Sequence, residues 1–67
     1  MTVAKIVEIS AESNKGFDDA IRHGVDRARK TLDGVKGAWL KDQQVEVGSD
    51  GTLTYRVSMK VTFLMNE

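Results

Sequence analysis

The 67-residue chain contains no cysteine and no proline, and it has only one histidine, His23. Without cysteine it has no disulfide framework, and a single histidine excludes a cysteine/histidine zinc site. A chain of this length forms one domain, and its core alone barely offsets the conformational entropy lost on folding. Since disulfides and structural zinc are excluded, we expect association with further copies of the chain to supply the missing stability.

The charges give no sign of a nucleic-acid or membrane partner. Ten basic residues balance ten acidic ones, so no net field attracts either kind of polyanionic surface. No apolar run approaches the roughly 20 residues that span a bilayer. The first residues, Met1 to Lys5, also lack the pattern of a signal peptide. We therefore expect a cytoplasmic protein.

The first half of the chain is typical of a strand followed by a helix. Residues 2–9 are rich in β-branched side chains and predict a strand that is covered at least partly on both faces. A helix is predicted after this strand, and Ser13 is the best candidate for its N-cap. The apolar residues after it recur at spacings of three and four and predict an amphipathic helix of about twenty residues. They are Phe17, Ala20, Ile21, Val25, Ala28 and Leu32. Gly24 lies inside this helix, where close packing against a sheet would compensate for its low helix propensity. Gly34 is the expected residue just after the helix.

The second half predicts a β-hairpin. Residues 38–47 favour a strand, and residues 48–51 form a loop that ends in the turn dipeptide Asp50-Gly51. Beyond it, apolar and polar residues alternate strictly, with the apolar ones at odd positions. The apolar members are Leu53, Tyr55, Val57, Met59, Val61, Phe63 and Met65. This pattern predicts a third strand with one apolar face and one polar face.

These elements give an α+β fold with a βαββ order in a single domain, residues 1–67. The first and second strands run in the same direction, so an all-antiparallel sheet needs the third strand between them, in the order 1-3-2. We expect the helix to cover the odd-numbered face of the third strand. The opposite face is then left without a cover and is a surface for assembly.

The register of the hairpin decides which side chains share that uncovered face. A four-residue loop pairs Gln43 with Arg56 and places Trp39 on the polar face beside Lys60. A three-residue loop would instead bury Trp39 under the helix together with Lys41 and Gln43, which is energetically costly. We therefore predict the four-residue loop, together with a bulge, or a strand end that projects beyond the helix, near Asp42.

Segments along nearly the whole chain resemble the dodecins. They are Lys5-Ile6-Val7-Glu8-Ile9, the helix with Ala20-Ile21 and Ala28-Arg29-Lys30-Thr31-Leu32, and Thr54-Tyr55-Arg56-Val57 followed by Val61-Thr62-Phe63. The resemblance implies a βαββ subunit in a hollow homododecamer that stores or buffers flavin. It also implies that isoalloxazine rings stack between symmetry-related tryptophans, that a glutamine on the third strand bonds the ring, and that the protein catalyses no reaction.

The chain departs from the flavin-binding members at both of these positions. Trp39 lies two positions further along the chain than the family's tryptophan, which keeps its strand face but moves the ring by one pleat. Arg56 occupies the place of the glutamine, and a guanidinium donates hydrogen bonds but cannot accept one from the flavin.

The sequence therefore predicts a flavin site built from Trp39, Gln43, Arg56 and Lys60, with riboflavin, FMN or FAD as the ligand. The alternative is a structural shell of the same fold that has lost flavin and holds another small ligand, an ion or nothing. In that case Trp39 is a subunit-interface anchor, and Arg56 forms an ion pair between subunits with Glu46 or Asp42. We expect no metal site at His23, because Arg27 occupies the position four residues later where a second ligand would lie. The sequence also lacks the residue sets of a nucleophilic or phosphate-binding enzyme.

Overall fold

The computed structural model describes residues 3–65 and contains one helix and three strands. The strand β1 (Val3–Ser13) is followed by the helix α1 (Phe17–Thr31), and the strands β2 (Val35–Val47) and β3 (Leu53–Met65) complete the chain. All neighbouring strands are antiparallel, in the order β1-β3-β2. The predicted α+β fold and strand order are confirmed. No helix among the described residues is long and apolar enough to cross a membrane.

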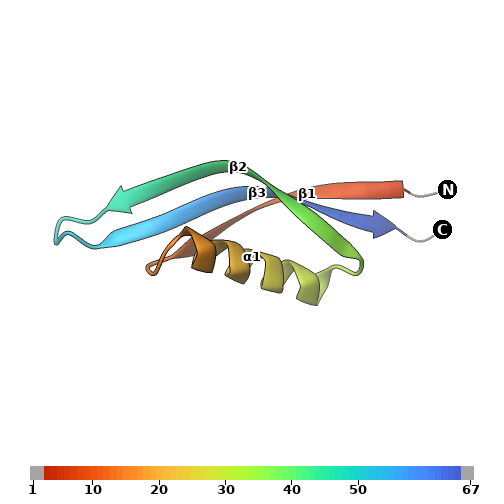
Figure 1. Ribbon diagram of the computed structural model, residues 1–67, viewed down its shortest axis with the longest axis horizontal. Coiled ribbons are helices and arrows are strands. Elements are labelled where there is room, and N and C mark those ends of the chain that lie inside the picture. Colours follow the sequence, from red (N-terminus) through yellow and green to blue (C-terminus); the bar gives the residue numbers. More distant parts are fainter. Residues whose placement is uncertain (1–2, 66–67) are drawn as a thin grey trace.

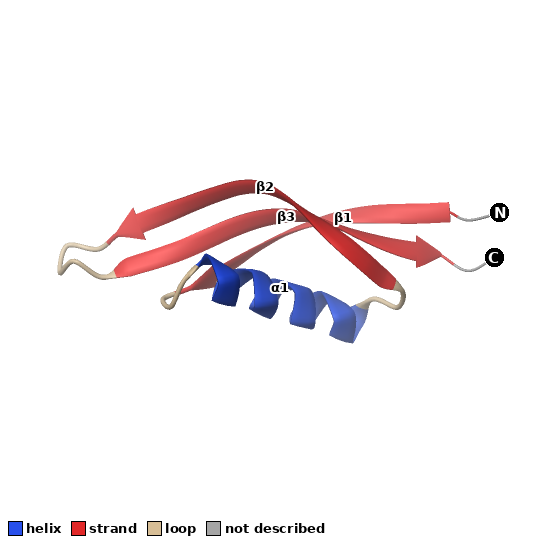
Figure 2. Ribbon diagram, viewed as in Figure 1, coloured by secondary structure: helices blue, strands red, loops and turns tan. Residues whose placement is uncertain are grey.

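The helix packs on one face of the sheet and leaves the other face bare (Figures 1 and 2). On the covered face, Val57, Met59 and Val61 of β3 are fully buried, as the alternation in the sequence predicts. Ala20 and Ala28 bring the helix onto these side chains. At Gly24 the helix backbone lies very close to the sheet. A Cβ added there would overlap the end of the Met59 side chain and lie 3.2 Å from the Cβ of Ala11.

The prediction that Ser13 caps the helix is wrong, because Ser13 is the last residue of β1. Gly16 occupies the N-cap position without a side-chain hydrogen bond, and the helix has 15 residues rather than about twenty. The Ser13 hydroxyl instead accepts the N–H of Lys15 at 2.9 Å and donates to Asp19 Oδ2 at 2.6 Å. Through these two hydrogen bonds, Ser13 links the end of β1 to the first turn of α1 across the loop that connects them.

Replacing Ser13 with alanine should raise the pKa of Asp19. The hydrogen bond from Ser13 is the main reason that this pKa lies below its ordinary value of 3.8. A lowered pKa in the folded state stabilises the fold above the unfolded value, and this stabilisation is lost as the pH falls through the folded value. NMR titration of the Asp19 carboxyl should show the increase in the Ser13→Ala variant. An unchanged pKa would contradict the role of this bond.

The hairpin register differs by one residue from the predicted one. The Asp50 carboxylate accepts the N–H of Thr52 at 3.1 Å and its hydroxyl at 2.8 Å, and these bonds hold Thr52 in the turn. The first pair of the ladder is therefore Val47 with Leu53. The predicted bulge near Asp42 is present between Leu40 and Asp42, and it brings the register back before Trp39. Trp39 thus pairs with Lys60, as predicted.

The subunit is elongated and exposes more surface than its size requires. Its extents are 52 × 19 × 13 Å, and its radius of gyration is 13.9 Å, against about 11 Å for a compact domain of this length. The accessible surface is 5075 Å², whereas a compact monomer of this mass exposes about 4,200 Å². Both ends of the sheet project beyond the helix (Figure 1), which accounts for this shape.

Candidate functional site

The sheet face that points away from α1, here called the open face, carries most of the candidate residues. Its side chains alternate with the buried ones along each strand. They include Glu8, Ser10 and Glu12 of β1; Arg56, Ser58 and Lys60 of β3; and Trp39, Asp42, Gln44 and Glu46 of β2. No element of residues 3–65 covers this face (Figure 2).

Trp39 is the one large aromatic side chain on the open face. It lies on the edge strand β2, pairs with Lys60 of the central strand, and its side chain is 73% exposed. Burying an indole of this size is strongly favourable, and both of its ring faces stack well on other aromatic rings. In one copy of the chain, this indole is therefore largely in contact with water.

The cations near Trp39 differ in their ionic partners. Lys60 has Glu8 of β1 opposite it, but Glu8 forms its ion pair with Lys41, at 3.2 Å between Nζ and Oε1. Lys41 is the extra residue of the bulge in β2. Among residues 3–65, no carboxylate lies within ion-pair distance of Lys60. Its ammonium group therefore carries an unneutralised positive charge beside the indole.

Arg56 is held by two carboxylates of its own chain. Its Nε donates to Glu12 Oε2 at 2.6 Å, and its Nη2 also donates to Glu46. The bond to Glu12 is the main reason that the pKa of this guanidinium rises above its ordinary value. The alternative interpretation of the sequence named Glu46 as a partner but placed the ion pair between subunits, whereas here it lies within one chain. Glu12 was missed because only the pairing of β1 with β3 brings it opposite Arg56.

The prediction that Gln43 shares a face with Trp39 and Arg56 is wrong. Because the ladder starts at Leu53, Gln43 pairs with the buried Val57 and lies on the helix side of the sheet. Gln44 takes its place opposite Arg56 on the open face. The structure therefore places Trp39 opposite Lys60 and Gln44 opposite Arg56 on the open face, with the two pairs four residues apart along β3, and it places Gln43 on the other face.

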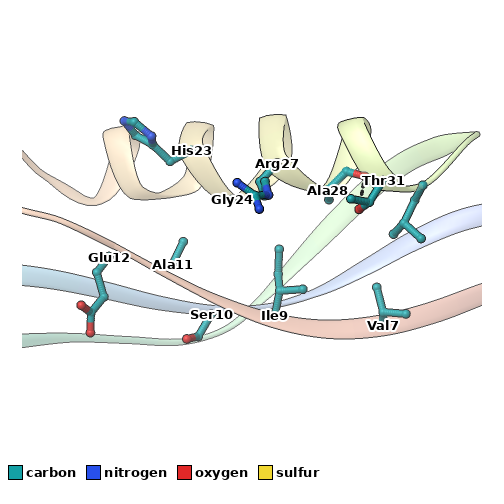
Figure 3. A pocket seen from close by; sticks show the side chains of 11 residues that line it. Val7, Ile9, Ser10, Ala11, Glu12, His23, Gly24, Arg27, Ala28 and Thr31 are labelled. Atoms are coloured by element: carbon teal, nitrogen blue, oxygen red, sulfur yellow. Dashed lines mark hydrogen bonds between the residues drawn. The ribbon is translucent and has the colours of Figure 1, made fainter.

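A second concave feature lies on the other side of the sheet, between α1 and β1 (Figure 3). This groove has a volume of about 570 Å³. Val7, Ile9 and Ala11 point into it from β1, while Ser10 and Glu12 of the same strand point away. Gly24 and Ala28 form its helical wall. This groove was not predicted from the sequence, because its apolar residues were assigned to the covered faces of the strand and the helix.

Residues 3–65 contain no group of three or more histidine and carboxylate side chains that could hold a metal ion. His23 lies 3.3 Å from Asp19, one turn earlier on the helix, and its side chain is largely exposed. That His23 binds no metal stays a prediction.

Comparison with known proteins gives one consistent result. The model of the Dodecin family matches residues 3–66. The calcium dodecin of Mycobacterium tuberculosis is 34% identical over 65 residues, which cover 97% of this chain and 92% of that protein. A dodecin of Thermus thermophilus is also 34% identical over 65 residues, covering 97% of this chain and 94% of that protein.

Solved structures agree with these matches. A Thermus thermophilus protein superposes with a TM-score of 0.92 at 33% identity, covering 100% of this chain and 98% of the other. The dodecin of Streptomyces davaonensis gives 0.91 at 27% identity, with 98% and 97% covered. The calcium dodecin from Mycobacterium tuberculosis, described with a calcium-binding site, gives 0.86 at 33% identity, with 96% and 91% covered.

Proposed function

This chain belongs to the dodecin family, and we propose that it binds and stores flavin on the open face of its sheet. In this proposal each chain is a single domain, and twelve chains form a hollow homododecamer in the cytoplasm. Proteins of this family are small binding proteins. The proposal therefore includes no catalytic turnover. The ligand is riboflavin, FMN or FAD, held without chemical change.

The exposure of Trp39 is the observation that carries the proposal. A side chain of this size, 73% exposed in one copy, loses its contact with water when two open faces meet about a symmetry axis. Two indoles would then wall a slot that accepts a flat aromatic ring. Stacking stabilises such a ring by about 1 kcal/mol per contact beyond the area that it buries.

The neighbouring polar groups have different roles in this proposal. Lys60 lies beside the indole without an ionic partner among residues 3–65, and its ammonium favours electron-rich ring carbonyls or a phosphate. Arg56 uses Nε and Nη2 for Glu12 and Glu46, which leaves Nη1 to donate to the ligand. Gln44 supplies the amide that can accept the flavin N–H, a role that a guanidinium cannot fill.

The second candidate function is a shell that holds a cation instead of flavin. The observation in its favour is that a relative 34% identical to this chain is named calcium dodecin. The open face carries Glu8, Glu12, Asp42 and Glu46. In a single copy Glu8 is paired with Lys41, and Glu12 and Glu46 are paired with Arg56, so a calcium site here would need carboxylates from neighbouring copies.

Titration of riboflavin and FMN into the purified protein tests the proposal. We expect quenching of flavin fluorescence and, by light scattering, a mass near twelve subunits. FMN should bind more tightly than riboflavin at low salt because of Lys60, and the difference should shrink as salt rises. An intact shell that quenches neither flavin contradicts flavin storage. Calorimetric titration with calcium then tests the cation shell.

A further inference from the structure

The groove between α1 and β1 has the features of a docking site. Val7, Ile9 and Ala11 form an apolar floor, and Leu32 also lines the groove. It is open at the side because β1 is an edge strand with no strand beyond it. The helix lines the groove with the small residues Gly24 and Ala28 and with the longer Arg27 (Figure 3).

The tip of the β2–β3 hairpin carries apolar side chains that its own chain does not cover. Val45 and Leu53 are each 40% exposed, and Val47 is 71% exposed. All three lie on the helix side of the sheet, since the neighbouring Tyr55 makes an edge-to-face contact with Phe17 at 5.1 Å between ring centroids. The helix begins at Phe17, and the hairpin continues past it into solvent (Figure 1).

We propose that this hairpin tip, Val45 to Leu53, fills the α1–β1 groove of a second copy of the chain. The inference rests on the assembly proposed above and names the surfaces that build it. The two features are complementary in kind: the tip has apolar side chains that its own chain does not cover, and the groove is a concave apolar surface beside an edge strand.

The surface area favours a second copy as the occupant. The subunit exposes 5075 Å², roughly 900 Å² more than a compact monomer of its mass. A stable interface buries about 800 Å² on each partner. The excess is thus the size of one ordinary protein interface, and it comes from the projecting ends of the sheet (Figure 1).

The charges at the two surfaces are complementary. Arg27 borders the groove, and among residues 3–65 no carboxylate lies within ion-pair distance of it. Asp50 lies in the turn at the tip, where its carboxylate accepts hydrogen bonds from Thr52 and no cation of the described residues is paired with it. Seating the tip in the groove brings an unpaired carboxylate toward an unpaired guanidinium.

This contact differs in symmetry from the meeting of two Trp39 faces. The tip and the groove are different surfaces, so the contact is heterologous and repeats from copy to copy until a ring closes. Two open faces that meet about a twofold axis form an isologous contact instead. A closed shell can use both, and each can be broken without the other.

Photo-crosslinking from the tip tests the proposal directly. The chain has no cysteine, so a Val47→Cys variant takes a single benzophenone label through its thiol. We expect irradiation of the assembled protein to give covalent dimers on a denaturing gel. Mass spectrometry should map the adduct to residues 7–11 or 24–32 of the other copy. A Lys30→Cys variant, labelled on the polar side of the helix, is the matched control and should not label those β1 residues.

The outcomes separate this inference from the proposed function. If the unmodified protein is monomeric, the proposed assembly fails and the tip contact fails with it. If the protein is oligomeric but the adduct maps elsewhere or no dimers form, the tip contact alone is wrong. The label at position 47 lies on the opposite side of the sheet from Trp39. Flavin quenching therefore tests the proposed function separately from the crosslinking, which tests the tip contact.

A charge placed at the tip supplies a second, independent measurement. Val47→Asp should raise the protein concentration at which the oligomer dissociates by roughly tenfold or more, the effect of losing one well-packed apolar anchor. Ser49→Asp adds the same charge two residues away without removing an apolar side chain and should leave that concentration nearly unchanged. Equal effects of the two substitutions would overturn the proposal.

Discussion

Replacing Trp39 with alanine is expected to abolish flavin binding while leaving the fold of the subunit intact. If each slot is walled by two symmetry-related indoles, one substitution removes both walls. Losing stacking and buried area costs roughly 2 kcal/mol per indole, so the dissociation constant should rise on the order of a thousandfold. The side chain is 73% exposed in the subunit, so its truncation should change the stability of the subunit little.

The matched control is Trp39→Phe, which keeps an aromatic face in the same place. It should retain quenching with weaker binding, because the smaller ring stacks on less of the isoalloxazine. Light scattering on both variants shows whether the shell is intact when binding is measured. If Trp39→Ala binds flavin as tightly as the unmodified protein, the flavin lies elsewhere and the slot is wrong.

The features that the sequence predicted well are those set by strand periodicity. The alternation from Leu53 to Met65 is long and strict, so the buried face of β3 and its central place follow from the residues alone. The pairing of Trp39 with Lys60 was also predicted. It held even though the turn was one residue longer than expected, because the bulge before Asp42 compensates for the shift.

The errors came from hydrogen bonds that short sequence patterns do not reveal. Ser13 has the residue type of an N-cap, but its hydroxyl bonds Asp19 from the end of a strand. The carboxylate of Asp50 keeps Thr52 in the turn and thereby moves Gln43 to the helix side of the sheet. The Arg56 site was incomplete for a different reason, since Glu12 is 44 residues away in the chain.

The turn between the helix and β2 depends on Gly34 for two separate reasons. The helix ends at Thr31, so Gly34 lies in this turn rather than directly after the helix as predicted. Its φ of +74° is in the left-handed region that side chains disfavour, and an added Cβ would lie 2.9 Å from the carbonyl oxygen of Leu64. The oxygen of Gly34 also accepts the N–H of Leu64 at 3.0 Å. The atom that would block a side chain at position 34 is therefore a backbone oxygen. It cannot move aside without breaking the hydrogen bond that links the start of β2 to the end of β3.

Gly34→Ala should therefore be the most destabilising of the glycine substitutions, with a loss of roughly 2–4 kcal/mol from strain and overlap together. Gly51→Ala isolates the strain, because its φ is +87° and no atom lies within 4 Å of an added Cβ. We expect it to cost about 1 kcal/mol. Urea unfolding at one fixed protein concentration measures both, since the stability of an oligomer depends on concentration. Equal losses for the two variants would mean that the overlap with Leu64 is relieved at no cost, and that the β2–β3 link does not constrain the turn.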